Sequence, residues 1–170
     1  MELTGFDPKV KEQIYKLSSS TLCSNTGGQI MTSLMVKGPE PGDVSYENHE
    51  MEKKTIFDSL KKRAKIASDG FNSIEGIECQ ESQGAMYCFP KITIPPKAID
   101  EAKSQGVSVD GMYAISLLKR TGICVVPASG FGQEPGRIGF RTTFLPAEDE
   151  MRKVVESVGT HHKEFCEKYA

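Results

Sequence analysis

The sequence predicts an α+β fold in which a small sheet has helices packed on one face and is preceded by an N-terminal helical arm. Two observations favour this class. Several short stretches have the apolar patterns of strands, and longer ones carry apolar residues at three- and four-residue spacing. In chain order they give two helices, a long helix, two strands, two helices, two strands and a final helix, an order typical of α+β domains.

The arm is expected over residues 1–43, separate from a second domain over 44–170. Pro8 suits the first position of a helix, so a helix is expected to begin there. A further stretch, IMTSLMV (30–36), is compatible with a buried helix, although the glycine pair before it weakens helix formation. The loop GPEPGD (38–43) then marks the break.

The second domain is expected to open with a long helix capped by Asp43 or Ser45. Its apolar face comprises Ile56, Leu60, Ala64, Ala67, Phe71 and Ile74. Two strands follow, GIECQE (76–81) and AMYCFPKITI (85–94), and the SQG sequence between them is expected to form the turn. Pro90 favours an edge position or a strand end.

Two more helices and a strand come next. A short helix is expected to end at Gly106, and another is expected to run from Asp110 to a terminating glycine, Gly122. The stretch ICVVP (123–127) is expected to be a short buried strand. Acidic residues after Pro146 suit the first turn of the last helix. Its apolar stripe comprises Met151, Val154, Val155, Val158, His162, Phe165 and Tyr169.

The most informative stretch is the strand RIGFRTTFL (137–145), whose side chains alternate between two faces. The face expected in the core carries Ile138, Phe140, Thr142 and Phe144. The other face carries Arg137, Gly139, Arg141 and Thr143. Arg141 is a candidate binding residue, because a guanidinium matches both oxygens of a carboxylate and stays charged. A solvated Arg141 is an equally open interpretation, and Arg137 is expected to be solvated.

Two glycine-rich stretches are weaker candidates. GFGQEPG (130–136) lacks the spacing of a dinucleotide fingerprint and precedes a strand instead of a helix, which excludes nucleotide binding. A tight turn with positive φ at Gly130 or Gly132 is expected there. SNTGGQ (24–29) offers backbone amides to a phosphate but lacks the Lys-Ser/Thr of a P-loop, which favours a loop or a helix start.

Composition excludes several classes of function. The net charge of −2 and the pI near 6.0 give no reason to expect nucleic acid or an anionic membrane as a partner. No apolar run approaches the roughly 20 residues that cross a bilayer, and the N-terminus has no apolar signal core. Five scattered cysteines without a CxxC pair indicate reduced thiols and a cytoplasmic compartment.

No metal site and no nucleophilic triad is expected. His161 and His162 are adjacent, so they point to different faces of a helix, and His49 stands alone. His162 lies on the apolar stripe and is expected to be a core histidine with satisfied nitrogens. Cys88 and Cys124 fall in expected strands, where inert core thiols are more common than nucleophiles.

Four longer stretches of the sequence indicate more than a fold class. They are CSNTGGQIMTSLMVKGPEPGD (23–43), QGAMYCFPKI (83–92), LLKRTGICVVPASGFGQEPG (117–136) and GFRTTFLPAEDEM (139–151). Together they resemble alanine aminotransferases, which are pyridoxal-phosphate enzymes of fold type I. The resemblance runs in order along the chain. It implies that the chain corresponds to the C-terminal part of such an enzyme: the end of the large domain, a connecting helix and the small domain.

The resemblance implies an incomplete site. The Schiff-base lysine and most cofactor contacts of the family would lie upstream, and none of Lys9, Lys11 or Lys16 sits in a matching motif. No catalytic residue, no cofactor-binding residue and no pyridoxal phosphate bound to this chain alone is therefore expected. Arg141 matches the arginine that binds the substrate α-carboxylate in the family. Ala128 departs from the family's usual glycine, and CSNTGGQ departs from a more Pro-rich string.

The complete enzyme is expected to be a homodimer that transfers an amino group between L-alanine and 2-oxoglutarate. The cytoplasm is expected, with the mitochondrion left open, and the isolated chain is expected to be inactive. A second function stays open: a stand-alone, non-catalytic module that binds an amino acid or a partner through the Arg141 face. Apolar arm residues without an obvious partner in the small domain favour the first hypothesis and predict self-association: Ile14, Leu17, Ile30, Leu34 and Met35.

Overall fold

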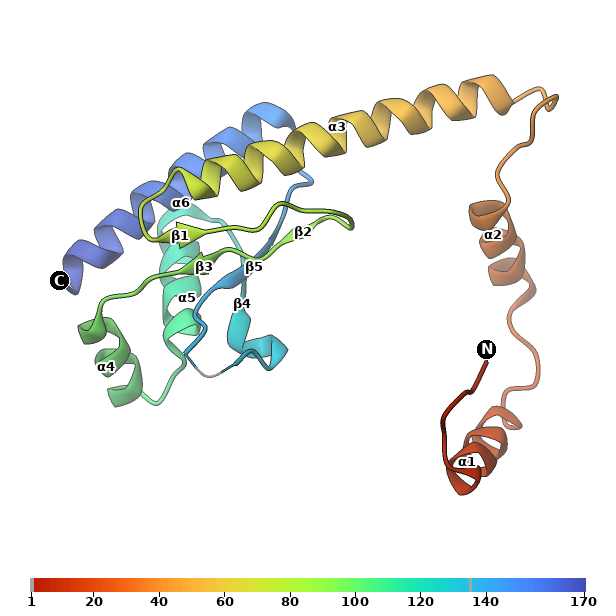
Figure 1. Ribbon diagram of the computed structural model, residues 1–170, viewed down its shortest axis with the longest axis horizontal. Helices are drawn as coiled ribbons and strands as arrows, with labels where there is room; N and C mark the ends of the chain where they lie inside the picture. The colour runs from red at the N-terminus through yellow and green to blue at the C-terminus, as the bar shows by residue number, and fades with distance from the viewer. Residues whose placement is uncertain (1, 135) are drawn as a thin grey trace. The chain divides into compact units, whose positions relative to one another are not determined.

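The structure, a computed structural model, describes residues 2–134 and 136–170 (Figure 1). The chain divides into two compact units, residues 1–52 and Lys53–Ala170. The long helix α3, Tyr46–Asn72, contributes to both units. No helix among the described residues is both long enough and apolar enough to cross a membrane.

The first unit contains α1 (Pro8–Ser18) and α2 (Thr26–Val36). Pro8 begins α1 as predicted, and the Asn25 side chain caps α2 by accepting a hydrogen bond from the amide of Gly28 over 2.9 Å. No residue of either helix is buried, so the expectation of a buried helix at 30–36 is wrong for this chain. Two short helices bring too little chain together to cover their own apolar side chains.

The second unit follows α3 with short strands and four further helical segments. In order these are β1 (Ile77–Glu78), β2 (Tyr87–Cys88), β3 (Lys91–Ile92), α4 (Pro96–Ser104), α5 (Val109–Thr121), β4 (Val126–Pro127), the 3₁₀ helix η1 (Ala128–Phe131), β5 (Phe140–Thr143) and α6 (Glu148–Lys168). The antiparallel sheets have the orders β1-β3 and β2-β5-β4. A bridge between Lys91 and Gly139 connects them.

The hairpin expected at 76–94 is wrong in one respect. Its second half is divided at Pro90 into β2 and β3, and the two pieces pair with different partners. Ile92 of β3 pairs with Ile77 of β1, whereas Tyr87 of β2 pairs with Thr143 of β5. Proline has no N–H to donate, so a ladder ends readily there.

Helix ends follow local sequence closely. Gly122 ends α5 with a φ of 76°, and three acidic residues occupy the first turn of α6, both as predicted. The start of α5 differs from the prediction, because Ser108 is its N-cap and Asp110 lies in its first turn. The strand expected at 123–127 is reduced to β4.

One hydrophobic core lies between the sheets and helices α3, α5 and α6. The Phe140 ring of β5 contacts Phe71 of α3 and Tyr113 of α5, each with ring centroids 6.1 Å apart, and Tyr113 contacts Phe165 of α6 at 5.1 Å. These three helices therefore cover one face of the sheet, as predicted, and Figure 1 shows α6 running alongside α3. Gly70 permits that approach, since a Cβ there would lie 2.8 Å from a Val155 methyl.

Candidate functional site

Arg141 lies on the central strand of the three-stranded sheet. On β5 the side chains of Phe140 and, just beyond it, Phe144 are 1% and 2% exposed and enter the core. Arg141 falls between them in the alternation and is half-buried, directly across from Val126 of β4. The predicted division of this strand into a core face and an opposite face is confirmed for these residues.

Two aromatic rings contact the Arg141 guanidinium. Its Cζ lies 4.6 Å from the ring centroid of Tyr87 and 4.9 Å from that of Phe131. Both distances fall within the roughly 6 Å over which a cation is attracted to the face of an aromatic ring. Rings that cover the flat faces of a guanidinium restrict its movement and leave its N–H edges free for a planar acceptor.

The rings come from two different segments. Tyr87 is on β2, where the alternation turns Cys88 into the core and leaves Tyr87 and Phe89 partly exposed. Phe131 ends η1, which is terminated by Gly132 at a φ of 64°. Phe89 and Phe131 meet edge to face at 5.5 Å. We call Tyr87, Phe89 and Phe131 the aromatic patch.

Arg141 forms no ion pair with any residue that the structure describes. Two other arginines, the exposed Arg120 and the half-buried Arg63, differ from it. Arg120 pairs with Glu164, and Arg63 donates to the backbone carbonyls of Leu145 and Pro146. A held guanidinium with free donors is the arrangement that binds a carboxylate from outside the chain.

The other glycine and arginine candidates do not join this site. Arg137 is exposed, as predicted, and its backbone amide donates to the Glu134 carbonyl. Of the two glycines proposed for the turn, Gly132 has the positive φ and Gly130 does not. In the SNTGGQ stretch the Asn25 side chain accepts a hydrogen bond from the Gly28 amide and caps α2. The interpretation of this stretch as a helix start is therefore confirmed.

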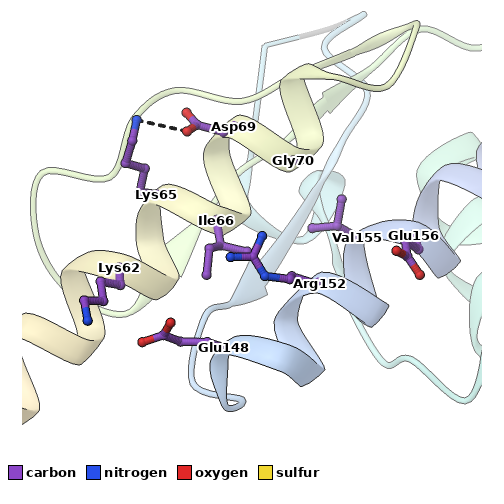
Figure 2. Close-up of a pocket in the computed structure, with 9 residues that line it drawn as sticks. All are labelled: Lys62, Lys65, Ile66, Asp69, Gly70, Glu148, Arg152, Val155 and Glu156. Carbon is purple, nitrogen blue, oxygen red and sulfur yellow. Dashed lines mark ion pairs between the residues drawn. The ribbon is translucent and has the colours of Figure 1, made fainter.

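A groove between α3 and α6 has a volume of about 710 Å³ (Figure 2). Its rim carries Lys62, Lys65, Asp69, Glu148, Arg152 and Glu156, and its floor carries Ile66, Gly70 and Val155. Lys65 and Asp69 pair over 2.9 Å. The three cations and three anions balance, so the groove offers no excess charge to an ionic ligand.

The cysteine and histidine side chains differ in burial and in hydrogen bonding. Among the described residues no cluster of three or more histidine, cysteine or acidic side chains is arranged to hold a metal. Cys124 is exposed, contrary to the expectation of a core thiol, because it precedes β4. His162 is buried as expected, but its Nδ1 and both nitrogens of His161 have no hydrogen-bond partner in the part of the chain that is described.

The aromatic patch was not predicted. The alternation in AMYCFP does place Tyr87 and Phe89 on the face opposite Cys88, so a signal for two of the rings was present in the sequence. Phe131 has no such periodic signal, because η1 is a single 3₁₀ turn.

The comparisons with known proteins agree with one another. The sequence model of the family "Aminotransferase class I and II" matches residues 3–158. The chain is 47% identical over 169 residues to alanine aminotransferase 2, mitochondrial, of Arabidopsis thaliana, covering 99% of this chain and 31% of that protein. It is 46% identical to glutamate–glyoxylate aminotransferase 2 of the same plant, covering 99% of this chain and 35% of that protein.

Among solved structures, alanine aminotransferase from Pyrococcus furiosus superposes with a TM-score of 0.68 at 28% identity, covering 91% of this chain and 34% of that one. The chain thus spans about a third of the length of these relatives. The predicted α+β fold and the resemblance stated above are both confirmed. Since the family match covers far more than half of its residues, the chain belongs to the class I and II aminotransferases.

Proposed function

We propose that this chain supplies the α-carboxylate-binding arginine, Arg141, of an aminotransferase that acts on L-alanine and 2-oxoglutarate. One observation carries the proposal: the Arg141 guanidinium contacts the rings of both Tyr87 and Phe131 and pairs with no carboxylate among the residues described. The names of two relatives, an alanine and a glutamate–glyoxylate aminotransferase, support this substrate class.

One arginine serves both halves of such a reaction. Amino-acid and 2-oxo-acid substrates each carry a carboxylate on the carbon that exchanges the amino group. Two parallel N–H···O bonds from a guanidinium fix that carboxylate in position and in rotation. Arg141 thereby orients the reacting carbon, which is a positioning contribution to the rate.

Aminotransferases of this family use pyridoxal phosphate, which takes up and releases the amino group. The described residues do not fit the role of holding it. Lys9 and Lys16 are exposed on α1, and Lys16 pairs with Glu12 over 3.0 Å. A Schiff-base lysine is usually activated by desolvation or by a neighbouring cation. We therefore assign no cofactor step to this chain.

The proposal also covers the oligomeric state and the compartment of the complete enzyme. Enzymes with this fold are typically dimers that bind amino and oxo acids, and we propose a homodimer for the complete enzyme. We propose the cytoplasm as its compartment from the sequence, whereas the Arabidopsis relative is named as mitochondrial. Imaging of the tagged gene product distinguishes the two compartments.

A chimera tests the substrate role directly. Residues 1–170 replace the matching segment of the Arabidopsis alanine aminotransferase, and pyruvate formation from L-alanine is measured. We expect Arg141→Ala to lower kcat/KM by roughly 10–100-fold, because a hydrogen bond to a charged group contributes about 1.5–3 kcal/mol. Arg137→Ala is the matched control, since Arg137 is exposed and precedes β5 by three residues, and we expect less than about a twofold effect.

Equal losses in the two variants would contradict the assignment. A second measurement uses the 170-residue chain alone and follows the Arg141 Nε–H signal by NMR during titration with L-alanine or pyruvate. A saturable shift that Arg137→Ala retains supports carboxylate binding at Arg141. Binding in this assay, combined with unchanged chimera kinetics in Arg141→Ala, would favour the non-catalytic module.

A further inference from the structure

We propose that Asp110 is a positioning residue for Arg141, acting through Ser129 and Phe131. This inference rests on the proposed carboxylate-binding role of Arg141. Asp110 lies in the first turn of α5, and its hydrogen bonds are to Gly111 and Ser129, not to Arg141. Its influence runs through η1, the 3₁₀ turn that carries one of the two rings against the guanidinium.

Asp110 is only 4% exposed although it carries a charge. Its carboxylate accepts hydrogen bonds from the Ser129 amide at 2.6 Å, the Ser129 hydroxyl at 2.9 Å and the Gly111 amide at 2.9 Å. No described lysine, arginine or histidine forms an ion pair with it. A buried carboxylate without a cation is costly unless such donors satisfy its oxygens.

Capping of α5 does not account for this burial. The Ser108 hydroxyl already accepts a hydrogen bond from the Gly111 amide, at 3.2 Å, and Ser108 is the N-cap residue. Two of the three hydrogen bonds to Asp110 come instead from Ser129, which lies 19 positions further along the chain. The carboxylate therefore joins α5 to η1.

The turn η1 is held at two points. The Ala128 amide donates to the Gly139 carbonyl at 2.9 Å, which ties the start of η1 to the chain entering β5. Ser129 is tied to Asp110 on the other side. Phe131 follows Ser129 by two residues, so these anchors set where its ring lies relative to Arg141.

Fixing this ring matters because an arginine side chain has many rotamers. Without one of its two rings the guanidinium gains freedom that substrate binding must remove. Small displacements of a positioning group lower the rate even when its chemistry is intact. Asp110 thus acts on Arg141 without touching it or the substrate.

The first test uses the 170-residue chain and needs no activity. Ring currents from Tyr87 and Phe131 displace the NMR signals of the Arg141 side-chain protons, which report the stacking directly. We expect Asp110→Asn and Phe131→Leu each to move these signals toward the values of an exposed arginine, with a smaller change in Ser129→Ala. The control is Val158→Ala, which removes core volume from α6 away from η1 and is expected to leave the Arg141 signals in place.

The chimera supplies the functional readout. We expect Asp110→Asn to raise KM for L-alanine and for 2-oxoglutarate by about tenfold and to change kcat less, as expected for a displaced binding group. Because the two residues act in one chain of contacts, Asp110→Asn combined with Phe131→Leu is expected to add little to Phe131→Leu alone.

The two proposals fail in different ways. If Asp110→Asn leaves the Arg141 signals unchanged, or if Val158→Ala moves them equally, the positioning role is wrong whatever the kinetics show. If Asp110→Asn moves the signals while Arg141→Ala leaves the chimera's kinetics unchanged, Asp110 does position Arg141 and the carboxylate role is wrong.

Discussion

Gly139 lies directly against the carbonyl oxygen of Pro90. A Cβ at position 139 would lie 2.4 Å from that oxygen, closer than non-bonded atoms approach. The contact occurs where the chain entering β5 crosses the junction of β2 and β3, and the Phe140 amide donates to the same Pro90 oxygen at 3.1 Å. Glycine at 139 thus allows the two sheets to join.

We predict that Gly139→Ala destabilises the second unit by about 1–3 kcal/mol, because backbone atoms must shift to admit the methyl group. Urea denaturation followed by circular dichroism measures the change. Gly130→Ala is the matched control, since no atom lies within 4 Å of a Cβ built there and its φ is not positive. An equal loss in both variants would show that the close approach at Gly139 is not the cause.

The two buried histidines predict a stability that depends on pH. Burial lowers the pKa of both His161 and His162, and for His161 the neighbouring Arg120 lowers it further. The unfolded chain therefore takes up these protons first, near pH 6.5. The free energy of unfolding is expected to be unaffected by them above that pH and to fall as pH decreases below about 6.5.

Urea midpoints at pH 7.5 and 5.5 measure this effect. The variant His161→Leu/His162→Leu is expected to show a smaller decrease between the two values, because it has lost the titrating groups. His49→Gln is the control, since His49 lies in the other unit. A decrease of the same size in all three proteins would assign the pH dependence to other residues.

Thiol reactivity is expected to follow burial. Cys23 and Cys124 are exposed, whereas Cys79 and Cys88 are buried. The adjacent Cys79 thiol and burial raise the pKa of Cys88, which further disfavours its reactive thiolate. With an aromatic disulfide reagent at pH 8, we predict rapid labelling that Cys23→Ser/Cys124→Ser abolishes. Cys166 is half-buried, and burial raises its pKa, so it is expected to react slowly. Rapid labelling that survives in this variant would contradict this expectation and the buried placement of Cys79 and Cys88.

The apolar face of α2 predicts self-association of the chain. Ile30 and Leu34 are one helical turn apart, and they are 57% and 64% exposed. Burying them in a contact between copies would remove apolar area from water. Sedimentation velocity is expected to show concentration-dependent oligomers that Ile30→Glu/Leu34→Glu dissociates. Gln29→Glu/Ser33→Glu adds the same charge to α2 and is expected to leave association intact.

The features that could be predicted from sequence depend on nearby residues. Gly122 ends α5 through its own φ, and alternation along β5 separates Phe140 from Arg141. Each of these signals lies within a few positions of the residue that it describes. The position of Arg141 on the face opposite the core could therefore be predicted from this strand's own sequence, without its partner strands.

The features that could not be predicted depend on distant segments. The SQG sequence predicts a hairpin because the two expected strands on either side of it are close in the sequence. In the structure β2 pairs instead with β5, which comes much later in the chain. The sequence predicts Asp110 only as the start of a helix. The hydrogen bond from the Ser129 amide to its carboxylate depends on the tertiary structure. Phe131 likewise needs tertiary structure to bring it over Arg141. Local periodicity carries no information about such pairs.

The two faces of β5 have a practical consequence for heat treatment. Phe140 and Arg141 are neighbours on one four-residue strand, so the residue that anchors the core and the residue proposed to bind a carboxylate share a backbone. Because melting of the core also displaces Arg141, carboxylate affinity should not outlast the folded second unit on a temperature ramp.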